Sequence, residues 1–437
     1  MSWLDFFQTT QTLKHTFGRG INAAISSKEE ELFIQSSEAF EKKEIIKAYK
    51  LFFQSLVNYT DKSSNENITY YITDNSLVFT IFQGCAKITG EVTEKSLSAE
   101  AILIKKKELN IALKRYILDR NYQFTYAYYA TDDKYVKLKL YSDNITMSPQ
   151  KVFFPLREIA LNADFDKEYI SNKFPKISLE DINHVKTLAV NESKLKYQYM
   201  HRWIDDLQNK IIHLPSNDNS AMQAFLYLNL LFQIDYLLVP KYKISQQLAT
   251  KILDYFSQKE NNIESKNEEI QEYVQDLKKI NYKEFNQNFY NANYTFNPTE
   301  KSSYEDIINF INESLTKIRW YKNNRYYHII PTIYKYIAFY TLYNYGLNPA
   351  LREFFQLIVE IQNTDFFHDL DYKMLYNPQT DEFNKKTIIS RVDNTIEHYK
   401  DRYKSLESFA QSLNFNSENE LYNSFYIEIQ NLNFEEI

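Results

Sequence analysis

Only five glycines occur among the 437 residues, and this scarcity constrains the fold more than any other feature of the sequence. Loops that cradle phosphate groups need several glycines close together, because their backbone N–H groups must approach the ligand. The glycines are scattered instead, at positions 18, 20, 84, 90 and 346. We therefore expect neither a P-loop nor a dinucleotide-binding turn. Helices need few glycines, so the composition favours helices over an all-β architecture.

The length and the charge of the chain limit the number of domains and the class of partner. A chain of 437 residues exceeds the usual size of one hydrophobic core, so we expect two or three domains. The formal charge is −6, and most of the acidic excess lies after residue 175. Neither part of the chain has the basic excess on which nonspecific phosphate binding depends, so a nucleic acid partner is not expected.

Cysteine usage and hydropathy favour a cytoplasmic location. Cys85 is the only cysteine, which excludes an intrachain disulfide and a cysteine metal cluster and fits a reducing compartment. We interpret it as a buried structural residue, since no His lies between His15 and His184 to activate its thiol. The N-terminus lacks the pattern of a signal peptide. The longest apolar stretch, 225–239, contains polar residues and is shorter than the ~20 residues that cross a bilayer, so we expect a buried helix and no membrane span.

Hydrophobic periodicity between residues 29 and 175 predicts a small sheet with flanking helices. Alternation on both sides of Asp74-Asn75 indicates an antiparallel hairpin, and Asp132-Asp133 marks a second one. In the second hairpin apolar residues alternate with Lys137 and Lys139, so we expect the sheet to be covered on one side only. The predicted elements are, in order, a helix over 29–59, strands before and after 74–75, a third strand within 85–104, a short helix at 109–117, strands before and after 132–133, and a helix over 147–174.

A run of alternating aromatic residues precedes the second of these turns. It comprises Tyr122, Phe124, Tyr126 and Tyr128. We interpret the run as the core face of a strand, because aromatic residues are favoured on half-buried strands. An exposed interface is the alternative, since tyrosine is enriched at interfaces.

From about residue 178 the pattern is almost entirely helical. Residues 257–279 are highly charged and are interpreted as a solvated helix or a linker. Between Ile389 and Leu413 apolar residues recur in steps of three and four, which predicts one long helix with a coiled-coil seam.

The predicted fold class is therefore α+β: an N-terminal helix and an antiparallel sheet with flanking helices, followed by a larger all-α domain, a bundle or an irregular solenoid. The predicted domains are an N-terminal arm or helix at 1–28, an α+β domain at 29–175 and an all-helical domain at 178–437.

One set of residues in the helical half has the composition of a metal site. His328, His368-Asp369 and Asp393 follow the ligand order of the HD superfamily of helical phosphohydrolases, which they resemble over about 65 residues. Such ligands on facing helices hold a divalent metal that activates water. A metal-dependent phosphohydrolase is thus the first alternative function. Packing at a loop edge and solvation beside the apolar seam explain the same residues without a metal.

A second alternative is nucleic acid binding. Segment 317–327 interleaves basic and aromatic residues, the combination that stacks on bases and contacts phosphates. The acidic balance of this half favours an ordinary solvated helix end instead.

The order of elements in residues 37–172 resembles the small α+β domain of class I type III secretion chaperones and the YbjN family. The resemblance is carried by the hairpins at Asp74-Asn75 and Asp132-Asp133, the short helix at 109–117 and the closing helix after Pro149. It covers about a third of the chain. It implies protein binding, often as a dimer, and no catalytic residues.

The function that we expect is a nonenzymatic adaptor or chaperone-like protein with a protein partner, and a homodimer is compatible with this role. No cofactor is expected.

Overall fold

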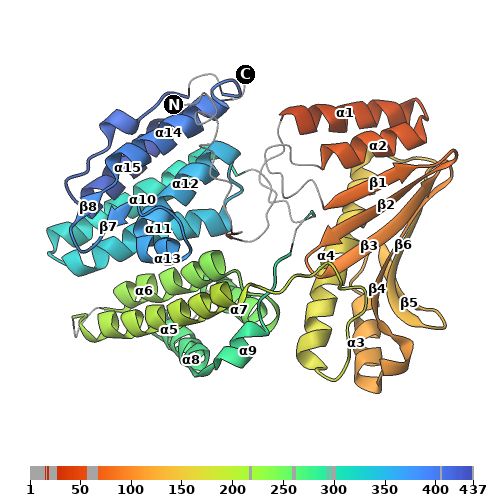
Figure 1. The fold of residues 1–437 in the computed structure, drawn as a ribbon, viewed down its shortest axis with the longest axis horizontal. Helices are drawn as coiled ribbons and strands as arrows, with labels where there is room; N and C mark the ends of the chain where they lie inside the picture. The colour runs from red at the N-terminus through yellow and green to blue at the C-terminus, as the bar shows by residue number, and fades with distance from the viewer. Residues whose placement is uncertain are drawn as a thin grey trace.

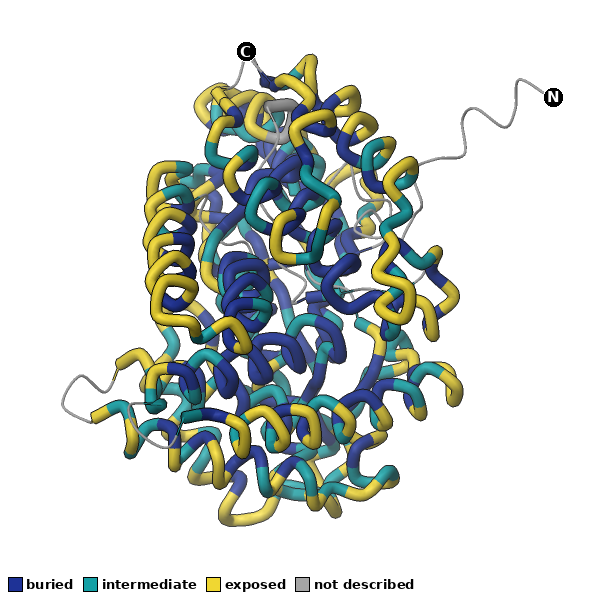
Figure 2. The backbone as a smooth tube through the Cα atoms, turned by 90° about the vertical axis from the view of Figure 1, so that its left-hand side faces the viewer, coloured by how far each residue is buried: buried dark blue, intermediate teal, exposed yellow. Residues whose placement is uncertain are grey.

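The computed structural model describes residues 15, 17–18, 27–56, 67–215, 219–257, 262–292, 295–296, 302–403 and 406–435. Within them an α+β portion and a larger helical portion lie side by side (Figure 1). Each portion has its own hydrophobic core. Figure 2 shows the buried residues along the inward sides of the helices. The predicted fold class, an α+β part followed by a larger all-α part, is confirmed. The predicted N-terminal arm lies mostly outside the described residues.

The first helical pattern forms two antiparallel helices rather than one. These are α1 (Ser27–Glu41) and α2 (Ile45–Ser55), which pack on each other. The chain reverses between them at Lys43, whose φ of 60° lies in the left-handed region and cannot continue a helix. The reversal lets both helices turn apolar residues inward, among them Phe40 and Tyr49, whose rings meet edge to face.

A six-stranded antiparallel sheet follows, with strand order β1-β2-β3-β4-β6-β5. Both predicted hairpins are present, and the region 85–104 forms two strands where one was expected. The extra turn lies between Thr93 and Ser96, whose backbone and hydroxyl groups are joined by hydrogen bonds. The strands are β1 (Ile68–Ile72), β2 (Ser76–Gln83), β3 (Ala86–Thr93), β4 (Ser96–Lys105), β5 (Ala127–Thr131) and β6 (Tyr135–Asp143).

The sheet is covered on one face, as the alternation of Lys137 and Lys139 predicts. Helices α2 and α4 (Pro149–Lys173) pack on the inner face. The outer face carries ion pairs: Lys137 Nζ lies 2.7 Å from a Glu100 oxygen and 2.9 Å from an Asp132 oxygen. The short helix α3 (Ile111–Asn121) begins after Asn110, whose side chain accepts a hydrogen bond from the Leu113 N–H.

The prediction that the alternating aromatic residues form a core face is wrong. Tyr126 and Tyr128 are 47% and 46% exposed, and Tyr122, which lies just beyond α3, is 93% exposed. The pairing of β5 with β6 places Ala127 opposite Leu140 and Tyr129 opposite Leu138. The odd-numbered residues therefore face the core, and the tyrosines at even positions face outward.

The helical portion begins with α5 (Val190–Ile212) and α6 (Ser220–Gln233). A π-helical turn, η4 (Ile234–Leu238), extends α6, and the combined segment is long and apolar enough to cross a membrane by length and composition alone. Within this protein 78% of its apolar window is buried, which is the property of a core helix. The expected buried helix is therefore present.

The other helices pack around α6 and α11. The helices of this portion that follow are α7 (Tyr242–Ser257), α8 (Ile263–Lys279), α9 (Tyr282–Asn286), α10 (Tyr304–Asn323), α11 (Ile330–Asn344), α12 (Pro349–Gln362), α13 (Thr364–Asp369), α14 (Lys385–Tyr399) and α15 (Glu418–Asn431). The portion also contains the 3-10 turns η5 (Tyr327–Ile329) and η6 (Ala410–Ser412) and a short hairpin of β7 (Tyr376–Asn377) and β8 (Glu382–Phe383), whereas the 3-10 turn η3 (Lys106–Glu108) follows β4 in the α+β portion. Helix α8, expected to be solvated, buries one face that includes Ile270 and Val274.

The prediction of one long helix between Ile389 and Leu413 is also wrong. Helix α14 ends at Tyr399, and the chain continues through a turn to η6. The apolar residues beyond Tyr399 are nevertheless buried, because the irregular segment stays against the core. Phe409, for example, packs edge-on against Phe354 and Phe425. A straight helix would carry these side chains away from the core.

The two portions share a tight junction. Thr295 and Phe296, from the segment after α9, donate their backbone N–H groups to Gln83 Oε1 at 2.8 Å each. The ring of Phe296 is fully buried in the core of the α+β portion. A segment of the helical half thus completes the core of the first half.

Candidate functional site

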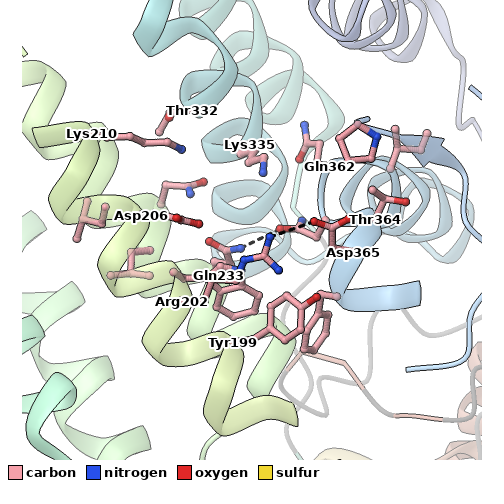
Figure 3. Close-up of a pocket in the computed structure, with 18 of the residues that line it drawn as sticks. Tyr199, Arg202, Asp206, Lys210, Gln233, Thr332, Lys335, Gln362, Thr364 and Asp365 are labelled. Carbon is pink, nitrogen blue, oxygen red and sulfur yellow. Dashed lines mark hydrogen bonds and ion pairs between the residues drawn. The ribbon is translucent and has the colours of Figure 1, made fainter. Parts of the chain in front are cut away.

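A cavity of about 260 Å³ opens in the helical portion between α5, α6, α11 and the α12–α13 junction (Figure 3). Residues from seven helices and strands line it. They are Tyr199, Arg202, Trp203, Asp206, Leu207, Lys210, Leu226, Asn229, Leu230, Gln233, Thr332, Lys335, Ile361, Gln362, Asn363, Thr364, Asp365, Phe366, Tyr376, Pro378 and Glu418. The cavity combines an apolar wall with polar and charged groups, the usual composition of a small-molecule site.

The mouth of the cavity is formed by charged side chains of α5. Arg202, Asp206 and Lys210 are spaced four residues apart, so they lie on one face of the helix. The guanidinium of Arg202 lies 3.3 Å from a carboxylate oxygen of Asp365 and above the ring of Tyr199. Asp206 and Lys210 have no ion pair within 4 Å among the described residues. The arginine is thus already paired, whereas the other two charges remain open to a ligand.

The floor is formed by Lys335 and Thr332 of α11 and Asn229 of α6. Thr332 and Lys335 are three residues apart, so both face the cavity. Within the described part of the chain, Lys335 has neither a hydrogen bond nor an ion pair. Loss of solvent, together with the nearby Lys210 ammonium, lowers the pKa of Lys335 to about 8, although the carboxylates of Glu418, Asp206 and Asp365 act to raise it. Asn229 is 8% exposed, and its buried Oδ1 atom has no hydrogen-bond partner in the structure.

Three other polar side chains of the cavity are held by hydrogen bonds, whereas both polar atoms of the Gln362 side chain are buried without a partner. Gln233 donates a hydrogen bond to the Asn363 side chain at 2.8 Å, and the Thr364 hydroxyl donates to the Tyr376 carbonyl at 2.8 Å. Tyr199 donates its hydroxyl to Asp369 at 2.7 Å. Buried polar groups in proteins are nearly always satisfied, so the unpartnered groups of the floor are exceptional. A bound molecule would supply the partners that Lys335 and Asn229 lack.

The rings of three aromatic residues form the apolar wall. Phe366 lies edge-on to Tyr199, with 5.1 Å between ring centroids, and 5.4 Å from the ring of Trp203. Phe366 also contacts Phe17, whose neighbour Gly18 donates its N–H to the Tyr236 carbonyl at 2.7 Å. The described part of the N-terminal segment therefore packs behind this wall.

The structure does not bring the predicted metal ligands together. His328 is exposed in η5, and Asp393 of α14 accepts a hydrogen bond from Ser408. His368 and Asp369 are neighbours at the end of α13, and Asp369 holds Tyr199 at the cavity. Among the residues that the structure describes, no group of three or more His, Cys, Asp or Glu side chains is placed to hold a metal ion.

The other two sequence candidates lie in different environments, one buried and one largely exposed. Cys85 is fully buried, as expected, and burial raises the pKa of its thiol well above the ordinary value. In segment 317–327 Trp320 and Tyr327 are 55% and 57% exposed, whereas Tyr321 packs in the core. The segment therefore offers two exposed aromatic rings beside basic residues.

A second group of buried charges lies at the junction of the two portions. Glu168 of α4 accepts a hydrogen bond from the Tyr290 hydroxyl at 2.6 Å. Burial, together with the nearby Asp164 carboxylate, raises the pKa of Glu168 to about 7. Lys241, 5% exposed, contributes an opposing positive charge. We regard this group as a structural element of the junction.

Sequence reasoning missed both groups. The spacing of Arg202, Asp206 and Lys210 was visible, but it lies beside the apolar stripe of α5 and resembles an ordinary solvated face. Lys335 sits within a very apolar helix, where a lone lysine is a signal of a special environment.

Comparisons with known proteins add no identification. The sequence matches no protein-family model, and a search of curated proteins finds no significant relative. The functional argument therefore rests on the geometry of the cavity.

Proposed function

We propose that this chain is a nonenzymatic binding protein whose helical half holds a small polar molecule in the cavity between α5, α6 and α11. One observation carries the proposal: Lys335, which has neither a hydrogen bond nor an ion pair within the described residues, and the buried side-chain amide of Asn229 line a cavity of about 260 Å³. A buried polar group that lacks a hydrogen bond costs about 1–3 kcal/mol, and a desolvated charge costs more. A ligand that forms hydrogen bonds with both groups removes this free-energy cost, and the free energy recovered contributes to binding.

The same geometry favours binding over catalysis. Within the described residues no metal cluster is present. The cavity lining contains no Cys, Ser or His side chain; Lys335, whose pKa is lowered to about 8, is the lining group most similar to a catalytic base, and we assign it to ligand binding.

The expected adaptor role is compatible with a ligand site and stays a second proposal. It is favoured by the outer face of the sheet, where Tyr128 of β5 and Tyr141 of β6 are 46% and 64% exposed. Exposed tyrosines of this kind are typical of protein interfaces. Copurification of a stoichiometric protein with the wild type, lost in the Tyr128→Ser and Tyr141→Ser double variant, is the expected result. Unchanged copurification would contradict a role for this face.

The ligand proposal is tested by thermal denaturation of the purified protein against a library of small polar metabolites. We expect compounds that raise the melting temperature in proportion to their occupancy of the cavity. Asn229→Leu, which fills the same volume without the polar Oδ1, should lose this response while its circular dichroism spectrum remains that of the wild type. The proposal fails if no compound stabilises the wild type, or if the variant responds to the same compounds with the same affinity.

A further inference from the structure

We propose that the ligand of this cavity carries an oxyanion, a carboxylate or a phosphate, that binds between the ammonium groups of Lys210 and Lys335. This inference rests on the proposed ligand-binding function and specifies the chemistry of the ligand.

The two lysines approach one space from different helices. Figure 3 shows Lys210 of α5 and Lys335 of α11 reaching into the same cavity. Neither has an ion pair within 4 Å among the described residues. The Lys210 ammonium contributes to the lowered pKa of Lys335, whereas the carboxylates of Glu418, Asp206 and Asp365 act in the opposite direction. An oxyanion between the two lysines would offset the repulsion between their ammonium groups by two charge-assisted hydrogen bonds.

Arg202 is not the centre of the proposed subsite. Its guanidinium is already paired with Asp365 at 3.3 Å. The positive charges that a ligand can use are therefore those of the lysines. Lysine binds oxyanions as a point charge from any direction, which suits a carboxylate or a phosphate equally.

The neighbouring groups define the rest of the ligand. The Thr332 hydroxyl lies on the same side of α11 as Lys335 and can donate a further hydrogen bond to the oxyanion. The Asp206 carboxylate is an acceptor, so it requires a donor such as a hydroxyl or an amino group on the ligand, and the side-chain amide of Asn229 lines the same cavity. The ligand thus carries an anionic group and at least one hydrogen-bond donor.

The charge balance of the cavity excludes a highly charged ligand. Arg202, Lys210 and Lys335 are matched by the carboxylates of Asp206, Asp365 and Glu418. The lining is therefore nearly neutral in sum, although its positive and negative groups are separated. A small molecule with one anionic group fits this arrangement, whereas a nucleic acid or another polyanion does not.

The inference is tested with sodium phosphate and sodium acetate as probes, each compared with sodium chloride at the same ionic strength. Melting temperature is measured as a function of anion concentration for the wild type and for Lys335→Met, Lys210→Met and the control Lys322→Met, whose side chain is exposed on α10. We expect one of the two anions to stabilise the protein more than chloride does, with a melting temperature that rises with the logarithm of the anion concentration above its Kd, which identifies phosphate or carboxylate as the preferred group. Its apparent affinity should fall at least tenfold in the two cavity variants and remain unchanged in the control.

A second measurement uses the wild type alone, so it does not depend on the folding of any variant. The saturating anion should protect Lys335 and Lys210, but not Lys322, from acetylation by acetic anhydride at pH 8, as mapped by mass spectrometry. Stabilisation equal to that of chloride, or equal in all variants, or absence of protection, would overturn the oxyanion inference. If neutral metabolites still bind and this binding depends on Asn229, the proposed ligand-binding function stands and only the oxyanion inference fails. If neutral metabolites do not bind either, the proposed function and the oxyanion inference both fail.

Discussion

The substitution Lys335→Met should stabilise the protein, in contrast to most substitutions at a partly buried position. The pKa of Lys335 is about 8 in the folded protein and 10.5 ordinarily, mainly because the side chain has lost solvent. The unfolded chain therefore binds this proton more tightly than the folded protein does. At about 1.36 kcal/mol per pKa unit, the folded state is destabilised by up to about 3 kcal/mol while Lys335 is protonated.

The sign of the pH dependence follows from the same values. Below pH 8 Lys335 is protonated in both the folded and the unfolded state, and the full destabilisation of the folded state is present. Between pH 8 and 10.5 the folded protein loses the proton first, so the free energy of unfolding of the wild type rises with pH. Methionine has a similar unbranched shape and no charge, so the variant lacks both the cost and this pH dependence. We expect it to be more stable than the wild type by about 1–3 kcal/mol at pH 7, with a smaller difference at pH 10.

Urea denaturation followed by tryptophan fluorescence measures this difference, because Trp203 and Trp320 both lie in the helical half. The protein is first dialysed against chloride buffer, so that no bound anion stabilises the wild type. The control Lys322→Met, on the exposed face of α10, should change the free energy of unfolding by less than about 0.5 kcal/mol. A variant that is less stable than the wild type at pH 7, or a difference that is the same at pH 7 and pH 10, would refute the reasoning.

Three further predictions concern the junction between the two portions. Tyr290→Phe removes the hydroxyl that donates to Glu168 at 2.6 Å, and we expect a loss of about 1–3 kcal/mol in urea denaturation, against almost none for Tyr327→Phe at an exposed position. The pKa of Glu168 is raised from 4.5 to about 7, so protonation of this group favours the folded state at low pH. The free energy of unfolding should therefore fall between pH 5 and 7 by up to about 3 kcal/mol. Glu168→Gln should reduce this dependence of the free energy of unfolding on pH. Gly84 has a φ of +55°, and a Cβ atom there would lie 2.1 Å from the Asp164 carboxylate, so Gly84→Ala should lower the melting temperature by several degrees while Gly346→Ala serves as the comparison.

The sequence predicted the elements that have a regular pattern and missed those decided by tertiary packing. Both hairpins and the closing helix α4 were predicted, because alternation and helical spacing are local properties. The aromatic run at Tyr126 and Tyr128 was assigned to the wrong face, since the register of β5 is set by its pairing with β6. The seam after Tyr399 was read as a helix because its spacing is helical, but irregular backbone holds the same side chains in the core.

The candidate site was even less predictable from the sequence, because tertiary packing brings its residues together. Its charged groups come from α5, α11, α13 and α15, and more than a hundred residues separate α5 from α11 in the sequence. No spacing rule joins Lys210 to Lys335, so their proximity could be learned only from the fold. The sequence order suggested His368 and Asp369 as metal ligands, and these residues lie next to the cavity wall, where Asp369 accepts a hydrogen bond from Tyr199. Among the described residues they belong to no group of three or more His, Cys, Asp or Glu side chains that could hold a metal ion.

The central claim is that the cavity holds a small molecule through Lys335 and its neighbours. Native mass spectrometry of the protein purified gently from its own cell tests this claim most directly. We predict that the wild type carries the mass of one small anionic molecule beyond that of its chain, and that Lys335→Met and Lys210→Met carry none. A wild type with the mass of the bare chain, or variants that keep the same added mass, would contradict the account.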